Sequence, residues 1–217
     1  MIRKLLVLAV VLLFYHNAGA QNTRISIEAN PQLIWLASDM DNIEKEGLMA
    51  GMKAGLILDF FFAERYAFST GLVFENLGGR ISYKEDLNFD ISGTPYLVAE
   101  GVEVKQRLQY FGIPIGLKLK TQEIGYSTFY INPGITPMVN ISSKAQGGNI
   151  PKKSDFSNES KLLNVNYFVS GGMEYSLGGS TSVFGGLGYS GGFLDVYSRS
   201  GYTIKTRSIY LTIGILF

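Results

Sequence analysis

The sequence lacks cysteine altogether and has a single histidine, His16, among 217 residues. Without cysteine there is no disulfide scaffold, so packing and backbone hydrogen bonds must hold the fold. His16 lies in an N-terminal segment that we expect to be removed, which leaves the rest of the chain with neither residue. Most catalytic and metal sites depend on one of these two side chains. We therefore expect a protein that is not an enzyme and holds no cofactor.

Charge and long apolar runs are also scarce. Charged residues make up 17% of the chain, and the net charge of +1 becomes −1 without Arg3 and Lys4 of the N-terminal segment, which argues against a nucleic acid partner. After the N-terminal segment no apolar run reaches about 18 residues, the length typical of a transmembrane helix. Glycine (26 residues), tyrosine (13) and phenylalanine (14) are by contrast abundant. This composition favours β-strands over membrane helices.

The N-terminus has the pattern of a secretory signal peptide. Arg3 and Lys4 precede the apolar run Leu5–Phe14, and the small residues Ala18-Gly19-Ala20 follow it. A membrane anchor would need roughly 17–25 apolar residues, more than this run provides. We expect residues 1–20 to be cleaved, with Gln21 as the new N-terminus. Residues 21–217 then form one domain.

Apolar residues recur at every second position through most of the chain, which is the period of a β-strand with one apolar face. In the clearest stretch, Phe111, Ile113 and Ile115 alternate with Gly112 and Pro114. No stretch keeps helical spacing for long. The pattern predicts eight strands, at Arg24–Trp35, Leu48–Phe61, Ala67–Tyr83, Val104–Leu119, Thr128–Ser142, Leu163–Leu177, Thr181–Tyr189 and Thr203–Phe217.

The connections between these strands alternate strictly between long and short. Such alternation is typical of a transmembrane barrel, with long loops outside the cell and short turns in the periplasm. The sequence therefore predicts an all-β fold, an eight-stranded antiparallel up-and-down transmembrane β-barrel in a bacterial outer membrane. The long connections are residues 36–47, 84–103, 143–161 and 190–202, and the short ones are residues 62–66, 120–127 and 178–180.

Charged residues fall on the strand faces that would point into the barrel. An eight-stranded barrel is narrow and its interior is filled by side chains. Isolated charges there would be costly, so we expect a buried network of ion pairs and hydrogen bonds. Such a filled interior argues against a general diffusion pore. The predicted members are Glu28, Lys53, Glu75, Lys118 and Glu174.

The last strand ends in an alternating apolar run. Ile213, Ile215 and Phe217 share one face of this strand. We interpret these three residues as the signal that the barrel-insertion machinery recognises, and we expect the last strand to close onto the first. An open terminal strand would expose unpaired backbone groups, which closure removes.

Aromatic residues gather near strand ends. Phe61, Tyr66 and Tyr126 lie beside the short connections, and Trp35 and Tyr83 lie toward the long ones. Two belts of aromatic side chains are typical of the two interfaces of a membrane barrel. Core aromatics of a soluble sandwich are the alternative reading.

Two short motifs are weak evidence for a binding site. Gly186–Gly191 matches the glycine pattern of a dinucleotide-binding turn, but another strand rather than a helix is expected after it. Asp39, Asp41 and Glu44 could ligate calcium, yet they lack the spacing and the glycine of a dedicated calcium loop. We interpret them as parts of a curved strand and of an exposed loop.

Three segments resemble the small outer-membrane β-barrel proteins of the Bacteroidota, the PorT-like or outer membrane protein beta-barrel domain group. These are Leu108–Lys118 with its Ile-Pro-Ile centre, Ser69–Phe74 followed by Gly78-Gly79, and Phe129–Gly134. The resemblance implies a single closed barrel in the outer membrane, comparable to the OmpX and OmpA domains, in a porin family with varied roles. Pro133 and Pro137 depart from the family pattern and predict a bulge or break there.

The sequence favours a non-enzymatic barrel that acts through its long loops, in a structural or surface-interaction role. One alternative is a narrow channel or a barrel associated with transport or secretion. Another is a soluble, lipocalin-like periplasmic protein that binds an apolar ligand inside, which would require apolar side chains to face inward. Expected partners are outer-membrane lipid and lipopolysaccharide, the insertion machinery, and a surface or secretion-complex protein.

Overall fold

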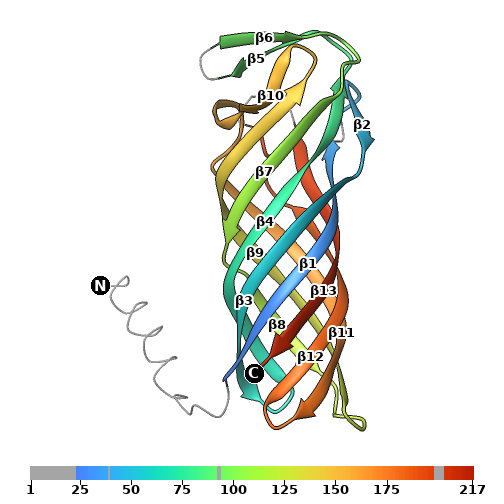
Figure 1. The fold of residues 1–217 in the computed structure, drawn as a ribbon, viewed down its shortest axis with the longest axis vertical. Helices are drawn as coiled ribbons and strands as arrows, with labels where there is room; N and C mark the ends of the chain where they lie inside the picture. Colours follow the sequence, from blue (N-terminus) through green and yellow to red (C-terminus); the bar gives the residue numbers. More distant parts are fainter. Residues whose placement is uncertain (1–22, 39, 92–93, 198–202) are drawn as a thin grey trace, which may run out of the picture.

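A computed structural model describes residues 23–38, 40–91, 94–197 and 203–217 (Figure 1). The predicted signal peptide, residues 1–20, lies outside the described residues. Within them, no helix is long and apolar enough to cross a membrane. The elements are β1 (Thr23–Ser38), β2 (Ile43–Gly47), β3 (Met49–Ala63), β4 (Tyr66–Tyr83), β5 (Leu87–Ile91), β6 (Thr94–Val98), β7 (Val104–Gly112), β8 (Ile115–Lys120), β9 (Ser127–Gly147), β10 (Ile150–Asp155), the 3-10 helix η2 (Ser157–Glu159), β11 (Leu163–Gly178), β12 (Thr181–Gly192) and β13 (Ile204–Leu216).

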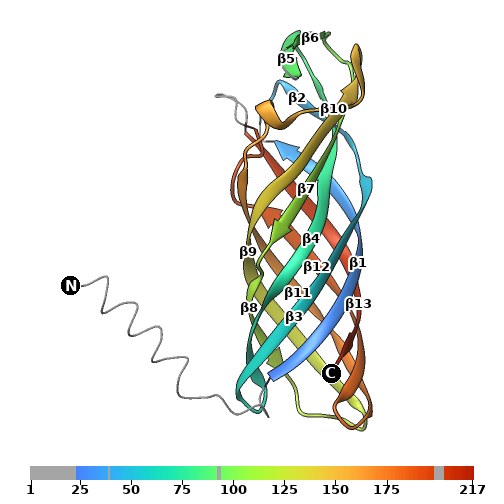
Figure 2. The same ribbon diagram turned by 60° about the vertical axis from the view of Figure 1, so that its left-hand side comes forward.

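The strands form a closed antiparallel ring. β1 pairs with β3 on one side and with β13 on the other, so the last strand completes the ring. The ring has eight positions, because β7 and β8 occupy one position between β4 and β9. Figures 1 and 2 show the strands tilted around a tall, narrow barrel. The predicted eight-stranded antiparallel barrel is confirmed.

Period-two alternation decides which side chains face outward. Along β1, Ile27 and Leu33 are exposed by 58% and 51%, whereas Ser26, Asn30 and Gln32 on the opposite face are buried. The same alternation in every ring strand surrounds the barrel with apolar side chains. Closure pairs the strand backbones, so this apolar surface has no open edge. An apolar exterior is the reverse of what the soluble lipocalin-like alternative requires.

The fourth predicted strand is interrupted at Ile113 and Pro114, opposite Pro137 of β9. β9 continues through Pro133 and Pro137, contrary to the predicted break in that strand. The ladder with β7 and β8 instead lacks the rungs opposite both prolines. Pro137 accepts a hydrogen bond from the amide of Ile113 at 3.0 Å but has no N–H to return. The partner strand therefore divides into β7 and β8.

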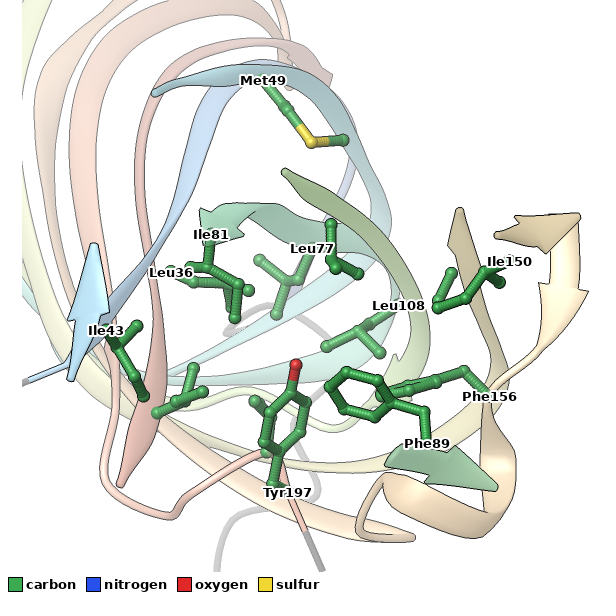
Figure 3. Close-up of a cluster of buried hydrophobic side chains, with 14 of the residues drawn as sticks. Leu36, Ile43, Met49, Leu77, Ile81, Phe89, Leu108, Ile150, Phe156 and Tyr197 are labelled. Atoms are coloured by element: carbon green, nitrogen blue, oxygen red, sulfur yellow. The ribbon is translucent and has the colours of Figure 1, made fainter. Parts of the chain in front are cut away.

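The interior changes character along the barrel axis. Toward the long loops, apolar side chains such as Leu36, Leu77 and Ile204 join the inward polar ones, among them Gln106 and Thr206. These apolar residues form a hydrophobic cluster with Phe89 of β5 and Phe156 beside η2 (Figure 3). The interior therefore contains a hydrophobic cluster in addition to the predicted charged residues.

The long loops are folded over the barrel end rather than extended. In Figure 1, β5 and β6 lie across the end of the ring, with β10 and β2 beside them. The ring of Phe89 lies 5.5 Å from that of Phe156 and 5.6 Å from that of Tyr83, centroid to centroid. Phe156 in turn lies 5.6 Å from Tyr197. We call this assembly of β5, β6, β10, η2 and residues 194–197 the cap.

One defect interrupts the barrel wall in the long-loop half. The ladder between β3 and β4 ends there and resumes between β2 and β4, leaving residues 48–52 opposite residues 76–79. The segment 48–52 thus has one residue more than the segment of β4 opposite it, as in a β-bulge. The side chain of Gln32, from inside the barrel, donates to the carbonyl oxygen of Asn76 at 2.8 Å. A side chain therefore satisfies a backbone group at the defect.

Candidate functional site in the barrel interior

The five charged residues predicted to face inward all lie inside the barrel, but they form two groups. Lys118 and Glu174 belong to a group near the short turns. Glu28, Lys53 and Glu75 belong to a second group, which begins on β1 and is continued on β3 and β4. No ion pair between described residues joins the two groups.

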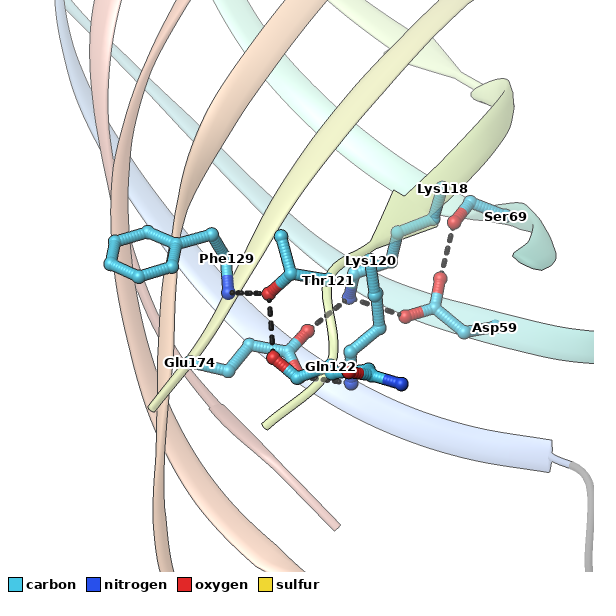
Figure 4. A network of polar contacts seen from close by, with 8 residues as sticks. All are labelled: Asp59, Ser69, Lys118, Lys120, Thr121, Gln122, Phe129 and Glu174. Atoms are coloured by element: carbon cyan, nitrogen blue, oxygen red, sulfur yellow. Dashed lines mark hydrogen bonds and ion pairs between the residues drawn. The ribbon is translucent and has the colours of Figure 1, made fainter. Parts of the chain in front are cut away.

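The group near the short turns is a chain of ion pairs centred on Lys118 (Figure 4). The Nζ of Lys118 lies 2.7 Å from Asp59 Oδ2 and 2.8 Å from Glu174 Oε1. Lys120 Nζ lies 2.5 Å from the other oxygen of Glu174, and the hydroxyl of Ser69 donates to Asp59. Two lysines thus balance two carboxylates that are almost fully buried. This balance permits charges in a dry interior.

The second group relies on an aromatic ring and an amide rather than on close ion pairs. Lys53 Nζ lies 4.1 Å from the centroid of the Tyr210 ring, within cation–π distance. Asn30 donates to Glu28 at 2.9 Å. A Cβ at Gly188 would collide with the Tyr210 ring, so glycine on β12 provides the space that this ring occupies.

The two groups and the hydrophobic cluster leave little open space inside. A cavity of about 50 Å³ lies between the groups, with Lys53 and Lys118 in its lining. A second cavity of about 340 Å³ lies at the short-turn end, where Lys120 and Glu174 line it. The Lys118–Glu174 ion pair therefore separates the internal cavity from this vestibule.

Chemically, the interior is suited to closing the barrel rather than to catalysis. A volume of about 50 Å³ holds one or two water molecules and no cofactor. Among the described residues, no group of three or more histidine, cysteine, aspartate or glutamate side chains is arranged to hold a metal ion. Asp59 and Glu174 are paired with lysines, and Glu28 accepts a hydrogen bond from Asn30.

Sequence reasoning missed Asp59 and Lys120. Asp59 lies on the same face of β3 as Lys53, six residues farther along, so its inward direction could be read from period two alone. Lys120 was placed in a short connection, but β8 extends through it and carries its side chain to Glu174. At the end of an alternating run, period two no longer decides which face of the strand a residue lies on.

The proposed insertion signal lies at the seam of the barrel. Ile213 and Ile215 face outward, exposed by 54% and 44%, and pair with both β12 and β1. Phe217 exchanges two backbone hydrogen bonds with Ile25, at 2.8 and 3.3 Å. The last residues thus close the ring, and a role in recognition by the insertion machinery stays a prediction.

The aromatic belts are only partly as predicted. Tyr66 and Tyr126 are exposed at the short-turn end, by 44% and 66%. Phe61 instead points inward, where the Nζ of Lys120 lies 5.5 Å from its ring centroid. Tyr83 is fully buried in the cap and donates to or accepts from Tyr197 at 2.8 Å. Phe61 and Tyr83 therefore pack inside the barrel, Phe61 against the Lys120 ammonium and Tyr83 against Tyr197 of the cap.

Neither short motif forms a binding site. Gly186–Gly191 lies within β12 and pairs with β11 and β13 over its length, as expected for a strand rather than a nucleotide-binding turn. In the acidic segment Asp39 lies outside the described residues. Glu44 forms an exposed ion pair with Lys84 at 3.3 Å.

Comparisons with known proteins agree with this architecture. The family model described as outer membrane protein beta-barrel domain matches residues 16–198. The solved structure of Neisserial surface protein A is 12% identical, with a TM-score of 0.53, covering 91% of this chain and 97% of that one. OprG from Pseudomonas aeruginosa (10% identity, TM-score 0.47, 90% and 94% covered) and the protease OmpT from Escherichia coli (10%, 0.43, 90% and 96%) are also similar. No curated protein matches the sequence.

Proposed function

Because the chain belongs to the outer membrane protein beta-barrel domain family, located in the outer membrane, we propose that it is a non-enzymatic, closed barrel that acts through its cap. The observation that carries this proposal is that the interior is blocked twice. Lys118 and Glu174 block it near the short turns, and the hydrophobic cluster around Leu77 and Phe89 blocks it near the long loops.

We also propose that the protein belongs to the PorT-like group of the Bacteroidota. This assignment rests on the three segments that resemble the group, and the Ile113-Pro114-Ile115 centre of one of them is the point where β7 ends and β8 begins. Because this centre lies opposite Pro137 of β9, it describes how the barrel is built and leaves the barrel's function open.

The cap supports a role in surface contact. It is a folded unit with its own hydrophobic packing, so it presents a fixed shape to the medium. Leu97 on β6 remains exposed by 49%, an apolar contact point of the kind found in protein interfaces. The proposed partner is a surface or secretion-complex protein that binds this face.

A catalytic role has little support in the described chain. OmpT, one of the similar structures, is a protease by its description. Here the sole histidine is His16, in the predicted signal peptide, and there is no cysteine. The carboxylates with buried partners, Asp59 and Glu174, are neutralised by Lys118 and Lys120.

Conductance across planar lipid bilayers tests the closed interior. We expect no stepwise current from the native barrel, because no continuous water path passes both blocks. Glu174→Gln should remain silent as well, since the hydrophobic cluster still closes the long-loop half. An ohmic current that Glu174→Gln or Lys53→Gln alters would instead establish the narrow channel and contradict our proposal.

A further inference from the structure

The outer surface of β4, β7 and β9 changes from apolar to basic over a short distance. Successive outward residues on one strand are about 6.5–7 Å apart, so each rung marks one step along the wall. The hydrogen-bonded rungs, toward the long loops, are Phe74–Phe111–Val139, Asn76–Gln109–Ser142, Gly78–Arg107–Lys144 and Arg80–Lys105–Gln146.

The first two rungs mark a boundary between lipid tails and polar groups. Phe74, Phe111 and Val139 are each exposed by 36–43%, as part of the apolar belt. One step on, the side chain of Gln109 donates to that of Asn76 at 3.0 Å on the outside of the barrel. Side-chain amides at this level suit the depth at which lipid headgroups begin.

A groove runs along this boundary and reaches the wall defect. Its volume is about 610 Å³. One end is apolar, lined by Met49, Ala50 and Met52 of β3, where the ladder with β4 is missing. The other end is lined by the basic side chains of Arg107 and Lys144. Asn76 and Leu77 of β4 line the groove between the two ends.

The basic end carries more positive than negative charge. Lys105, Arg107 and Lys144 form no ion pair with any described residue. Arg80 lies beside them and is 3.7 Å from Glu103. The other nearby acid is Asp155 of β10.

Asp155 pairs in register with Lys144 across β9 and β10. Both the hydroxyl and the backbone N–H of Ser157 donate to it, and these bonds hold the pKa of the Asp155 carboxyl below its ordinary value. The positive charge of Lys144 also lowers this pKa, but the two side chains form no ion pair, so the Lys144 ammonium remains available to an external anion.

We propose that this groove binds a phosphorylated lipid of the leaflet at the long-loop end. The phosphate lies between Arg107 and Lys144, and an acyl chain lies along Ala50 and Met52. The surface favours a lipid as the occupant, because the basic end of the groove continues directly from the apolar belt. A lipid also has a charged head for the basic end and an apolar tail for the apolar end.

Reconstitution in nanodiscs tests the site. The barrel without residues 1–20 is placed in phosphatidylcholine containing diphosphoryl lipid A, and bound lipid A is counted by native mass spectrometry. We expect Arg107→Gln with Lys144→Gln to lower the affinity roughly tenfold or more, since each basic side chain near an anionic lipid surface contributes to binding.

The matched control is Lys205→Gln with Arg207→Gln. Like Arg107 and Lys144, these two basic residues face outward. They occupy alternate positions of β13, which lies across the ring from β7. The control should bind lipid A like the native barrel. Equal loss in both double variants would reduce the effect to general surface charge and overturn the proposed site.

A second variant, Ala50→Trp, probes the apolar end while leaving all charges in place. We expect it to weaken lipid A binding, whereas binding of inorganic pyrophosphate stays unchanged. If pyrophosphate displaces lipid A completely from the native barrel, or if Ala50→Trp has no effect, the occupant is a free anion and the lipid proposal is wrong. Unboiled gel mobility checks that each variant is folded.

Discussion

Lys118 is the residue on which the polar half of the interior depends. It contacts both Asp59 and Glu174, from strands on different sides of the ring, and its side chain is only 8% exposed. Without Lys118, Asp59 would keep only the hydroxyl of Ser69 and Glu174 would keep only Lys120. A single side chain therefore sets the charge balance between β3, β8 and β11.

We expect Lys118→Met to lower the free energy of unfolding by about 3–5 kcal/mol, the usual cost of removing one partner from a buried ion pair. Urea titration of the barrel in phospholipid vesicles measures this. The matched control combines Lys118→Met with Asp59→Asn, which removes the stranded charge while Glu174 keeps its ion pair with Lys120, and should restore most of the loss. A loss below about 1 kcal/mol in the single variant would contradict the role given to Lys118.

Among the elements, β5 and β6 show how a long loop is stabilised. They pair only with each other, from Leu87 opposite Val98 to Ile91 opposite Thr94. A lone two-stranded hairpin is marginally stable in water. Packing of Phe89 against Phe156 and Tyr83 supplies what the hairpin itself lacks.

Phe89→Ala should therefore loosen the cap without unfolding the ring. Truncating a buried phenylalanine costs about 3–5 kcal/mol, and here that cost falls on the cap. Protease added to intact cells should cut the cap of the variant much faster than that of the native protein. Leu97→Ala, on the exposed side of the same hairpin, should leave the cutting rate unchanged. Equal rates for all three proteins would contradict a packed cap.

The same elements show what could and could not be predicted from the sequence. Period two located the eight ring strands and the inward charges, because a membrane barrel repeats one local rule in every strand. The cap was missed because β5 and β6 are five residues each and depend on Phe156, far away in sequence. The wall defect could not be predicted either, since it depends on how residues 48–52 pair with residues 76–79 of a neighbouring strand.

For the whole molecule, closure predicts resistance to detergent. Every ring strand has two neighbours, so dodecyl sulfate has no edge at which to begin separating them. Unboiled outer-membrane samples should give a fast-migrating band on gels, and boiling should slow it. Absence from the membrane pellet, together with unchanged mobility after boiling, would contradict the barrel in its membrane.

The pairing of β1 with β13 has a consequence for how the protein reaches its final form. Ser26 meets Leu216, so the contact that completes the ring joins the two extremes of the described chain. Such distant contacts form slowly, because much chain entropy is lost before they contribute. Until then β1 and β13 each present a row of unpaired backbone groups and an apolar face, which favours aggregation. The period between export and closure is therefore when this chain most needs protection in transit.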